Sequence, residues 1–311
     1  MPRVFVTRRL ALAPRDVLGG GLEIDQHDSE LALPRDELLR RVREISGLVP
    51  TLADRVDTEL LDAAPRLRVV ANHAVGYDNV DVQACTARGV WVTNTPDVLT
   101  DATADLAWAL ILALARRLRE GERLVRAGAY VGWAPTMLLG RELRGRTLGI
   151  LGYGRIGRAV ARRAEGFGMR VLFTARGGGA PFDELLQQSD VLSIHCPLTK
   201  ETRHLFDAAA LLRMKRGALL VNTARGPIVD EAALAAALES GHLGGAALDV
   251  FEHEPLVHPA LVNRDDVVLL PHLGSATYEA RESMARIALT QVELVLRGER
   301  PRTPVNDIEA K

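Results

Sequence analysis

Residues 147–157 read Thr-Leu-Gly-Ile-Leu-Gly-Tyr-Gly-Arg-Ile-Gly, and this stretch decides the fold. Its first five residues are typical of a buried strand, and Gly152, Gly154 and Gly157 follow with the spacing of a glycine-rich phosphate loop. Beyond the loop, apolar residues recur at helical spacing from Ile156 to Phe167. A strand, a glycine turn and a helix N-terminus together bind the pyrophosphate of a dinucleotide, because N–H groups and the helix dipole face the anion. The stretch therefore predicts a dinucleotide-binding domain.

Apolar runs that alternate with helical patterns extend in both directions from this loop. Such alternation is typical of parallel sheets with helices on their faces, so we expect an α/β protein with two doubly wound parallel sheets. The predicted strands before the loop are Val4–Val6, Gly47–Val49, Leu67–Ala71 and Val90–Val92, with helices at Arg35–Glu44 and Val80–Arg88. From the loop onward, strands are predicted at Leu148–Leu151, Arg170–Phe173, Val191–Ile194, Leu219–Val221, Ala246–Asp249 and Val267–Leu270, with a helix at Asp183–Gln188.

Two longer helical patterns set the expected domain boundaries. The pattern from Leu99 to Arg119 is apolar nearly all round, which predicts a helix buried on several sides, partly against a second subunit. The pattern from Thr277 to Leu296 ends at Gly298, as expected of a glycine that follows a helix C-terminus. We expect this last helix to return to the first domain. The prediction is a discontinuous substrate domain, 1–97 with 277–311, and a dinucleotide-binding domain, 98–276.

Composition excludes several classes of partner. A length of 311 residues with 47% hydrophobic content suits two packed domains. The 39 basic and 40 acidic residues nearly cancel, so we expect neither nucleic acid nor anionic lipid as a partner. No apolar run suits a signal peptide or a membrane span, and we expect a cytoplasmic protein. Cys85 and Cys196 lie far apart and are predicted to be reduced thiols.

The residues after the second strand of the dinucleotide domain bear on the choice between NAD and NADP. An NAD site carries Asp or Glu about 20 residues past the glycine loop, where the carboxylate binds the ribose, but this position is Ala175. Loss of the carboxylate removes repulsion against a 2′-phosphate, and Arg176 can donate charge-assisted hydrogen bonds to that phosphate. We therefore expect NADP(H) to be preferred, with the use of NAD(H) left open.

Three polar residues downstream of the glycine loop each follow an apolar strand pattern: Arg225, Glu254 and His272. Ligands of open α/β sheets bind outside the carboxyl ends of the strands. We therefore expect these three side chains to converge on the edge where the dinucleotide is held.

The chain resembles the D-isomer-specific 2-hydroxyacid dehydrogenase family, nearest its glyoxylate/hydroxypyruvate reductase branch. The resemblance runs over essentially the whole chain and implies a Rossmann cofactor domain inserted in a flavodoxin-like substrate domain. The matching segments are HAVGYDN (73–79), TPDVLTDATADLAWAL (95–110), GYGRIG (152–157), HCPLTKETRHLF (195–206), NTARGPIVDEAAL (222–234), ALDVFEHEP (247–255) and PHLGSAT (271–277).

The resemblance implies roles for the three polar residues. His272 would be the general acid that protonates a carbonyl oxygen as hydride arrives from NADPH, and Glu254 would hold that imidazole and stabilise its charge. A proton is then available near neutral pH. Arg225 would bind a 2-oxo acid, because its fork of donors can clamp a carboxylate and polarise the adjacent carbonyl. The expected function is reduction of glyoxylate and hydroxypyruvate to D-2-hydroxy acids in a homodimer.

The resemblance also implies binding residues around these three. The substrate carboxylate would meet the backbone amides of Val75 and Gly76, and Trp133 would either look toward the neighbouring subunit's site or pack in the interface. The implied cofactor-binding residues are Thr103, Gly152, Gly154, Arg155, Ile156, Gly157, Ala175, Arg176, Pro197, Thr223, Ala224, Asp249 and Ser275.

Two alternatives stay open at this point. The chain can be a sibling dehydrogenase with another substrate, such as a phosphonate, phosphoglycerate or a longer 2-oxo acid; formate-type members pair the histidine with Gln, so Glu254 opposes a formate substrate. It can also be a nucleotide-sensing protein like the corepressors that share the fold, although it has no long basic or polar extension at either end.

The sequence departs from the family's pattern between Arg176 and Asp183, where members usually have a longer connection and another small strand. This shortening affects the adenine side of the predicted pocket and not the reacting centre. The other histidines show no metal-ligand spacing, so no metal site is predicted. Of these, His195 follows a predicted strand and can approach the cofactor, whereas His27, His204, His242, His253 and His258 are expected to be surface or capping residues.

Overall fold

The computed structural model describes residues 1–308 and divides into two compact units. Unit 1 comprises Met1–Leu99 together with the described part of Ala276–Lys311, and unit 2 comprises Thr100–Ser275. Both contain parallel sheets, so the predicted α/β class is confirmed. No helix within residues 1–308 is long and apolar enough to cross a membrane.

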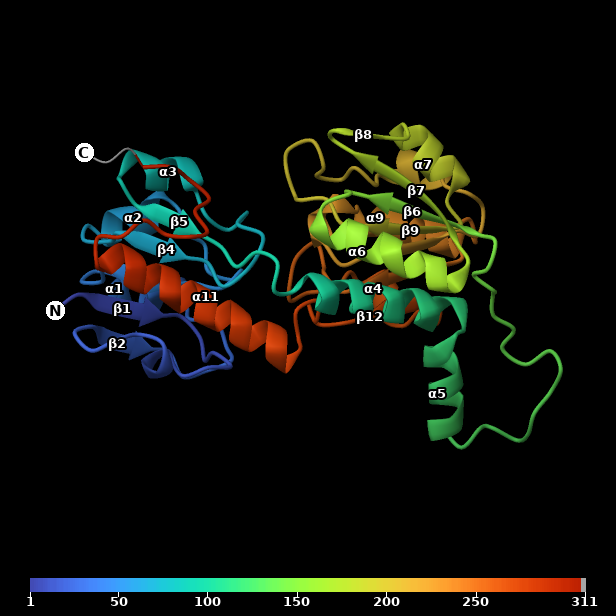
Figure 1. Cartoon of the computed structure of the whole chain (residues 1–311). Coiled ribbons are helices and arrows are strands. Elements are labelled where there is room, and N and C mark those ends of the chain that lie inside the picture. Colours follow the sequence, from blue (N-terminus) through green and yellow to red (C-terminus); the bar gives the residue numbers. More distant parts are fainter. Residues whose placement is uncertain (309–311) are drawn as a thin grey trace. The chain divides into compact units, whose positions relative to one another are not determined.

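Unit 1 is built on a parallel sheet of five strands in the order β2-β1-β3-β4-β5 (Figure 1). This order is the flavodoxin-like arrangement of doubly wound folds. The strands are β1 (Arg3–Val6), β2 (Glu23–Gln26), β3 (Gly47–Val49), β4 (Val69–Ala71) and β5 (Trp91–Thr93). The helices are α1 (Arg35–Arg41), α2 (Thr58–Ala63), α3 (Val82–Ala87) and α11 (Tyr278–Leu296), with a short 3-10 turn at Pro14–Asp16.

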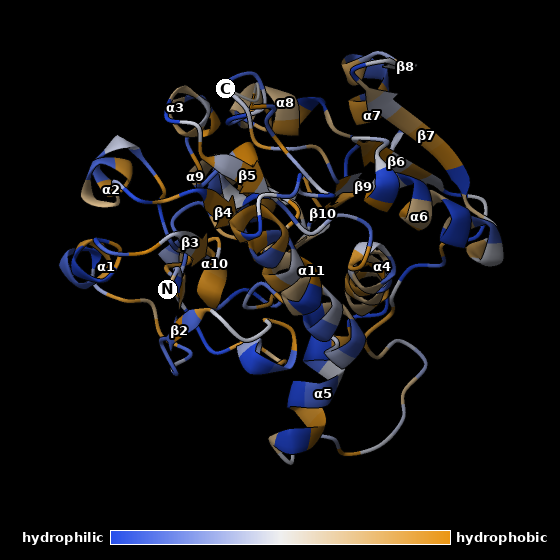
Figure 2. Ribbon diagram, turned by 60° about the vertical axis from the view of Figure 1, so that its left-hand side comes forward, coloured by the Kyte–Doolittle hydropathy of each residue, from blue (hydrophilic) through white to orange (hydrophobic). Residues whose placement is uncertain are grey.

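The strands of unit 1 bury both faces because successive side chains point to opposite sides. In β1, Phe5 joins one core cluster with residues of α1 and α2, whereas Val4 and Val6 join another with residues of α11. The edge strand β2 reads Glu-Ile-Asp-Gln and is drawn largely blue in Figure 2. Charged residues on an edge strand oppose pairing with another chain.

Unit 2 contains a seven-stranded sheet in the order β12-β11-β10-β9-β6-β7-β8, parallel except for β8. This is the Rossmann order, with β6 as the first strand. The strands are β6 (Thr147–Leu151), β7 (Arg170–Ala175), β8 (Gly178–Gly179), β9 (Val191–Ile194), β10 (Leu219–Asn222), β11 (Gly245–Leu248) and β12 (Val267–Leu269). The helices are α4 (Thr100–Ala115), α5 (Leu118–Arg126), α6 (Arg155–Ala164), α7 (Phe182–Gln188), α8 (Ala208–Arg213), α9 (Glu231–Glu239) and α10 (Pro259–Val262), with 3-10 turns at Glu165–Phe167 and Gly226–Ile228.

The two faces of this sheet are covered by different helices. Residues of α4 and α6 pack on one face, and residues of α7, α8 and α9 pack on the other. β10 shows the division: Leu219 and Val221 join the first cluster and Leu220 joins the second. Because all the strands except β8 run parallel, their carboxyl ends lie at one edge, where the predicted site residues follow them.

The helix predicted from Leu99 to Arg119 is two helices. α4 ends at Ala115, and Arg117 takes a left-handed conformation with φ 53° before α5 begins at Leu118. α4 is buried as predicted, but none of the nine residues of α5, all of them described, is buried. α5 and the segment after it extend away from the rest of unit 2 (Figure 1). Charged residues such as Arg119 and Glu120 in α5 explain why the buried apolar pattern stops at α4.

Candidate active site

The glycine loop between β6 and α6 leaves no room for side chains at two of its three glycines. Gly152 has φ 93°, and a Cβ there would lie 2.5 Å from the Cys196 backbone nitrogen. A Cβ on Gly157 would lie 2.1 Å from the Gly152 carbonyl oxygen. By contrast, a Cβ built on Gly154, the residue that caps α6, would meet no atom of the described chain within 4 Å beyond its own neighbours in sequence. This open side at a helix N-terminus suits a pyrophosphate.

Other features of the carboxyl edge also fit a dinucleotide. Thr223 follows β10, and its buried Oγ1 has no hydrogen-bond partner among the described residues. Ala175 is the last residue of β7 and Arg176 after it is exposed, so no carboxylate stands at the end of this strand. The connection that follows contains β8, a two-residue strand antiparallel to β7, in place of the longer segment usual in the family.

Glu254 and His272 form a hydrogen-bonded pair. His272 Nδ1 lies 3.1 Å from Glu254 Oε2, and the Phe251 N–H donates to Glu254 Oε1 at 3.1 Å. Because an ionised carboxylate only accepts, Nδ1 carries the shared proton and Nε2 is left for a ligand. Burial opposes ionisation of Glu254, but the hydrogen bond and charge of His272, the Phe251 amide and the Arg225 charge together lower the pKa of this carboxyl. Glu254 is therefore ionised at neutral pH.

His272 is held in an uncommon backbone conformation by Asp249. Its φ of 57° is left-handed, which non-glycine residues adopt mainly where surrounding contacts enforce it. The His272 N–H donates to the Asp249 carbonyl at 2.9 Å, and the buried Asp249 carboxylate accepts from the N–H groups of Leu273 at 2.6 Å and Gly274 at 2.8 Å. Burial raises the pKa of Asp249, although these amides and the His272 charge act against it. Thr103 Oγ1 completes the clamp by donating to the Gly274 carbonyl at 2.9 Å.

Arg225 lies at the start of the 3-10 turn Gly226–Ile228, after β10. The buried Asn222 shapes this turn, since its Nδ2 donates to the Arg225 carbonyl at 2.8 Å and its Oδ1 accepts from the Ala224 N–H at 3.0 Å. The Arg225 charge contributes to lowering the pKa of Glu254. The structure thus brings together an arginine, a carboxylate and an imidazole at the carboxyl edge of one sheet.

Glu231, which the sequence analysis did not single out, braces the loop that carries Glu254. It begins α9 and is 4% exposed. Its two carboxylate oxygens accept from the N–H groups of Glu252 at 2.8 Å and His258 at 3.1 Å, on either side of Glu254. An acidic residue at the start of a helical pattern was the available signal, but its burial and its long-range partners cannot be read from sequence.

The remaining predicted residues lie in loops at strand ends or on the protruding segment. Pro197 and Ser275 follow β9 and β12, and Arg155 and Ile156 begin α6. Val75 and Gly76 follow β4 in unit 1. Trp133 lies after α5 and is 77% exposed.

Three further groups, His195, Cys85 and Cys196, are poorly suited to acid–base or nucleophilic chemistry. His195 follows β9 and lies 2.8 Å from Ser193 Oγ, and burial lowers the pKa of its imidazole to about 4. Cys85 and Cys196 are free, and burial raises their pKa to about 12 and about 11. No group of three or more metal-ligating side chains occurs among residues 1–308.

Comparison with known proteins agrees with this geometry. Residues 108–274, more than half of the chain, match the family described as D-isomer specific 2-hydroxyacid dehydrogenase, NAD binding domain. A glyoxylate reductase from Thermococcus onnurineus (strain NA1) is 49% identical over 320 residues, which cover 98% of this chain and 96% of the relative.

Two solved structures extend the likeness to the whole fold. A protein from Thermus thermophilus has a TM-score of 0.92 and 48% identity, covering 98% of this chain and 100% of the other. An NADPH-dependent glyoxylate/hydroxypyruvate reductase from Sinorhizobium meliloti, in complex with NADP and malonate, has a TM-score of 0.85 and 36% identity, covering 98% and 96%. The resemblance noted in the sequence is confirmed. The chain belongs to the D-isomer specific 2-hydroxyacid dehydrogenase family, in its glyoxylate reductase branch, and is an NAD(P)-dependent oxidoreductase.

Proposed function

We propose that this protein is an NADPH-preferring reductase of small 2-oxo acids that gives D-2-hydroxy acids, converting hydroxypyruvate to D-glycerate and glyoxylate to the achiral glycolate. The observation that carries the proposal is the Glu254–His272 pair, with 3.1 Å between Oε2 and Nδ1, at the carboxyl edge of the sheet whose first strand leads into the glycine loop. In this assignment residues 98–276 bind the dinucleotide and the rest of the chain binds the substrate. Names of relatives in the same branch support glyoxylate as a substrate.

His272 is the proton donor in this proposal. The ion pair with Glu254 stabilises the imidazolium and presents Nε2–H to the carbonyl oxygen, so the developing alkoxide is neutralised as it forms. The bound reduced nicotinamide supplies the hydride. Arg225 clamps the substrate carboxylate and polarises the adjacent carbonyl, which a rigid fork of donors does better than an ammonium. The left-handed His272 backbone, held by Asp249, keeps the imidazole in place between turnovers.

Val75 and Gly76 supply backbone donors for the carboxylate in this proposal. Neither N–H donates to any acceptor in the described chain, although both residues are only half-exposed. Adjacent free amides of this kind bind anions. The same two residues lie in a loop at the carboxyl end of β4, where ligands of a doubly wound sheet bind.

The preference for NADPH rests on Ala175 and Arg176. The end of β7 offers no carboxylate for a ribose hydroxyl, and the exposed Arg176 can pair with a 2′-phosphate. Replacement Arg176→Ala should raise KM for NADPH by about 10- to 150-fold, the worth of a charge-assisted hydrogen bond, and leave KM for NADH within about 2-fold. A variant that keeps the wild-type preference for NADPH over NADH would refute this assignment.

A spectrophotometric panel tests the substrate assignment. Loss of NADH or NADPH absorbance is followed with glyoxylate, hydroxypyruvate, pyruvate and phenylpyruvate, and the chirality of the glycerate formed is determined. We expect the highest kcat/KM with NADPH and glyoxylate or hydroxypyruvate, and D-glycerate as product. Negligible turnover of all four acids, or an L product, would overturn the proposal.

We further propose that the protein acts as a homodimer through α5 and the segment after it. This segment exposes Val125, Tyr130, Val131 and Trp133, with Val131 fully exposed. A protruding apolar segment in a globular chain is typical of a protein–protein interface. Trp133 lies in it and serves either the partner's site or the interface. Sedimentation should give a dimer, and a monomer at micromolar concentration would contradict this.

A further inference from the structure

The loop that presents Val75 and Gly76 is held by the side-chain amides of asparagines. Asn94 Nδ2 donates to the Val75 carbonyl at 2.8 Å, and Asn72 Nδ2 donates to the Gly76 carbonyl at 2.8 Å. Asn72 is fully buried and Asn94 is half-buried. A third carbonyl, that of Ala74, accepts the Thr95 backbone N–H at 2.9 Å. Three consecutive carbonyls of the loop are therefore occupied by donors from its own unit.

These contacts set the direction of three backbone N–H groups. A peptide unit is planar, with its C=O and N–H pointing opposite ways. Fixing the carbonyls of Ala74, Val75 and Gly76 therefore also fixes the N–H groups of Val75, Gly76 and Tyr77, each of which points away from the donor that its own carbonyl accepts. None of these three N–H groups has an acceptor among residues 1–308. We call these three consecutive N–H groups the amide row.

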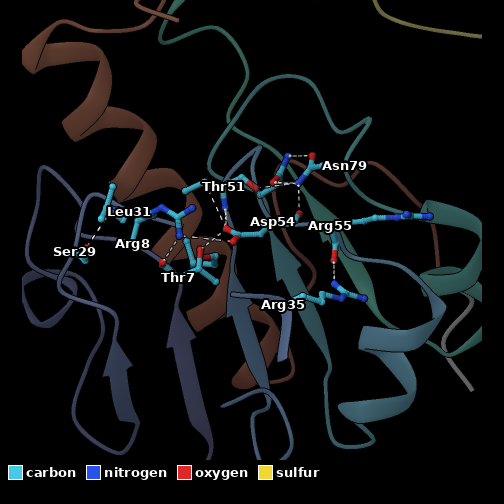
Figure 3. A network of polar contacts seen from close by, with 11 residues as sticks. Thr7, Arg8, Ser29, Leu31, Arg35, Thr51, Asp54, Arg55 and Asn79 are labelled. Atoms are coloured by element: carbon cyan, nitrogen blue, oxygen red, sulfur yellow. Dashed lines mark hydrogen bonds and ion pairs between the residues drawn. The ribbon is translucent and has the colours of Figure 1, made fainter. Parts of the chain in front are cut away.

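Asn79 connects this loop to a second loop at the same edge. Asn72 and Asn79 exchange amide hydrogen bonds at 3.2 and 3.1 Å. Asn79 Nδ2 also donates to the carbonyls of Thr51 at 3.1 Å and Asp54 at 3.0 Å (Figure 3). The loop of residues 51–54 follows β3 and contains Leu52.

The buried Asp54 carboxylate anchors the second loop to the end of β1. Its Oδ2 accepts from Thr7 Oγ1 at 2.6 Å, from the Thr51 N–H at 2.8 Å and from Thr51 Oγ1 at 2.9 Å, as Figure 3 shows. Arg8 Nη1 lies 3.7 Å from Asp54 Oδ1. A continuous network thus runs from β1 through Asp54 and Asn79 to Asn72 and the amide row. Buried networks of this kind keep a loop in one conformation.

We propose that Asn72, Asn79 and Asn94 are positioning residues for substrate: they aim the amide row, including Tyr77 N–H, at the carboxylate of the 2-oxo acid. This inference rests on the proposed function. None of the three side chains touches the reacting atoms; each acts through a carbonyl of the loop or through another asparagine.

The test compares Asn94→Asp and Asn72→Asp with wild type. Aspartate has nearly the same shape, but its oxygen faces the loop carbonyl where the amide donated, so the peptide plane turns. We expect KM for glyoxylate, and the Kd of oxalate for the coenzyme-bound enzyme, to rise at least about 10-fold. We expect kcat to stay within about 3-fold and the Kd of NADPH within about 2-fold. Loss of folding alone would lower the apparent kcat through the active fraction and leave KM unchanged, so a rise in KM at near-normal kcat distinguishes mispositioned amides from misfolding.

Asn306→Asp is the matched control. Asn306 lies in the same unit and donates to the Val90 carbonyl at 3.0 Å, away from the loop. The Asn306→Asp variant should therefore bind oxalate with the affinity of wild type. If an aspartate variant does not fold, Asn94→Ala removes the same donor without adding charge and should still raise KM. Wild-type enzyme that neither binds oxalate nor reduces a 2-oxo acid overturns the proposed function itself. Wild-type activity with KM and oxalate affinity unchanged in the asparagine variants overturns this inference alone.

Discussion

Replacement Glu254→Gln keeps the shape of the side chain but removes the charge beside His272. The side chain of His272 is 31% exposed and that of Glu254 is 39% exposed, so solvent screens the interaction between their charges nearly as in water. At the observed 3.1 Å, two unit charges then attract by about 1.3 kcal/mol. A free energy of about 1.4 kcal/mol corresponds to a factor of about 10 in rate. Loss of the carboxylate should therefore lower kcat/KM for glyoxylate by about 10-fold.

The direction follows from the proton that His272 donates. Reduction requires the imidazolium, which the Glu254 carboxylate stabilises. The neutral amide of Glu254→Gln cannot stabilise that charge, so the variant should be slower. The assay is kcat/KM for glyoxylate at neutral pH, with Glu239→Gln at the exposed end of α9 as control. A kcat/KM equal to that of wild type in Glu254→Gln would refute the role given to Glu254.

Two other perturbations follow from the site and its surroundings. Arg225→Lys keeps the charge but loses the forked donors, so kcat/KM should fall by about 10- to 150-fold. The control variant Arg203→Lys, on an exposed loop, should have the kcat/KM of wild type. Equal activity of the two variants would show that Arg225 does not clamp the substrate. Burial lowers the pKa of both the His73 and the His195 imidazole to about 4, from 6.5 in the unfolded chain, and the Arg281 charge adds to this effect at His73. Both imidazoles are neutral in the folded protein, so their contribution to the free energy of unfolding is fully present above pH 6.5 and is lost as pH falls toward 4. His73→Asn should flatten part of this pH dependence, measured by thermal unfolding at several pH values. An unchanged pH dependence would contradict the assignment.

The sequence predicted the elements whose signal is local. β3 and β9 have the predicted ends, and β6 and α6 flank the glycine loop as expected. β2 was not predicted, because Glu-Ile-Asp-Gln lacks an apolar run and becomes a strand only by pairing with β1. The break at Arg117 was also missed, because its left-handed backbone depends on tertiary context.

Site prediction followed the same division. Glu254 and His272 could be assigned because each follows a strand in a recognisable segment, and their hydrogen bond appears in the structure. Glu231, Asn222 and Asn79 could not, because their roles depend on carbonyls and amides distant in sequence. Asp249 was expected beside the cofactor, and the structure adds the hydrogen bonds by which its carboxylate holds the loop of His272.

The most direct measurement is steady-state reduction of glyoxylate by His272→Ala, with NADPH binding followed separately by fluorescence. We expect kcat to fall by at least about 10² to 10⁴, the usual contribution of a general acid, with the Kd of NADPH unchanged. Near-normal turnover in this variant would contradict the assignment of His272 as the proton donor.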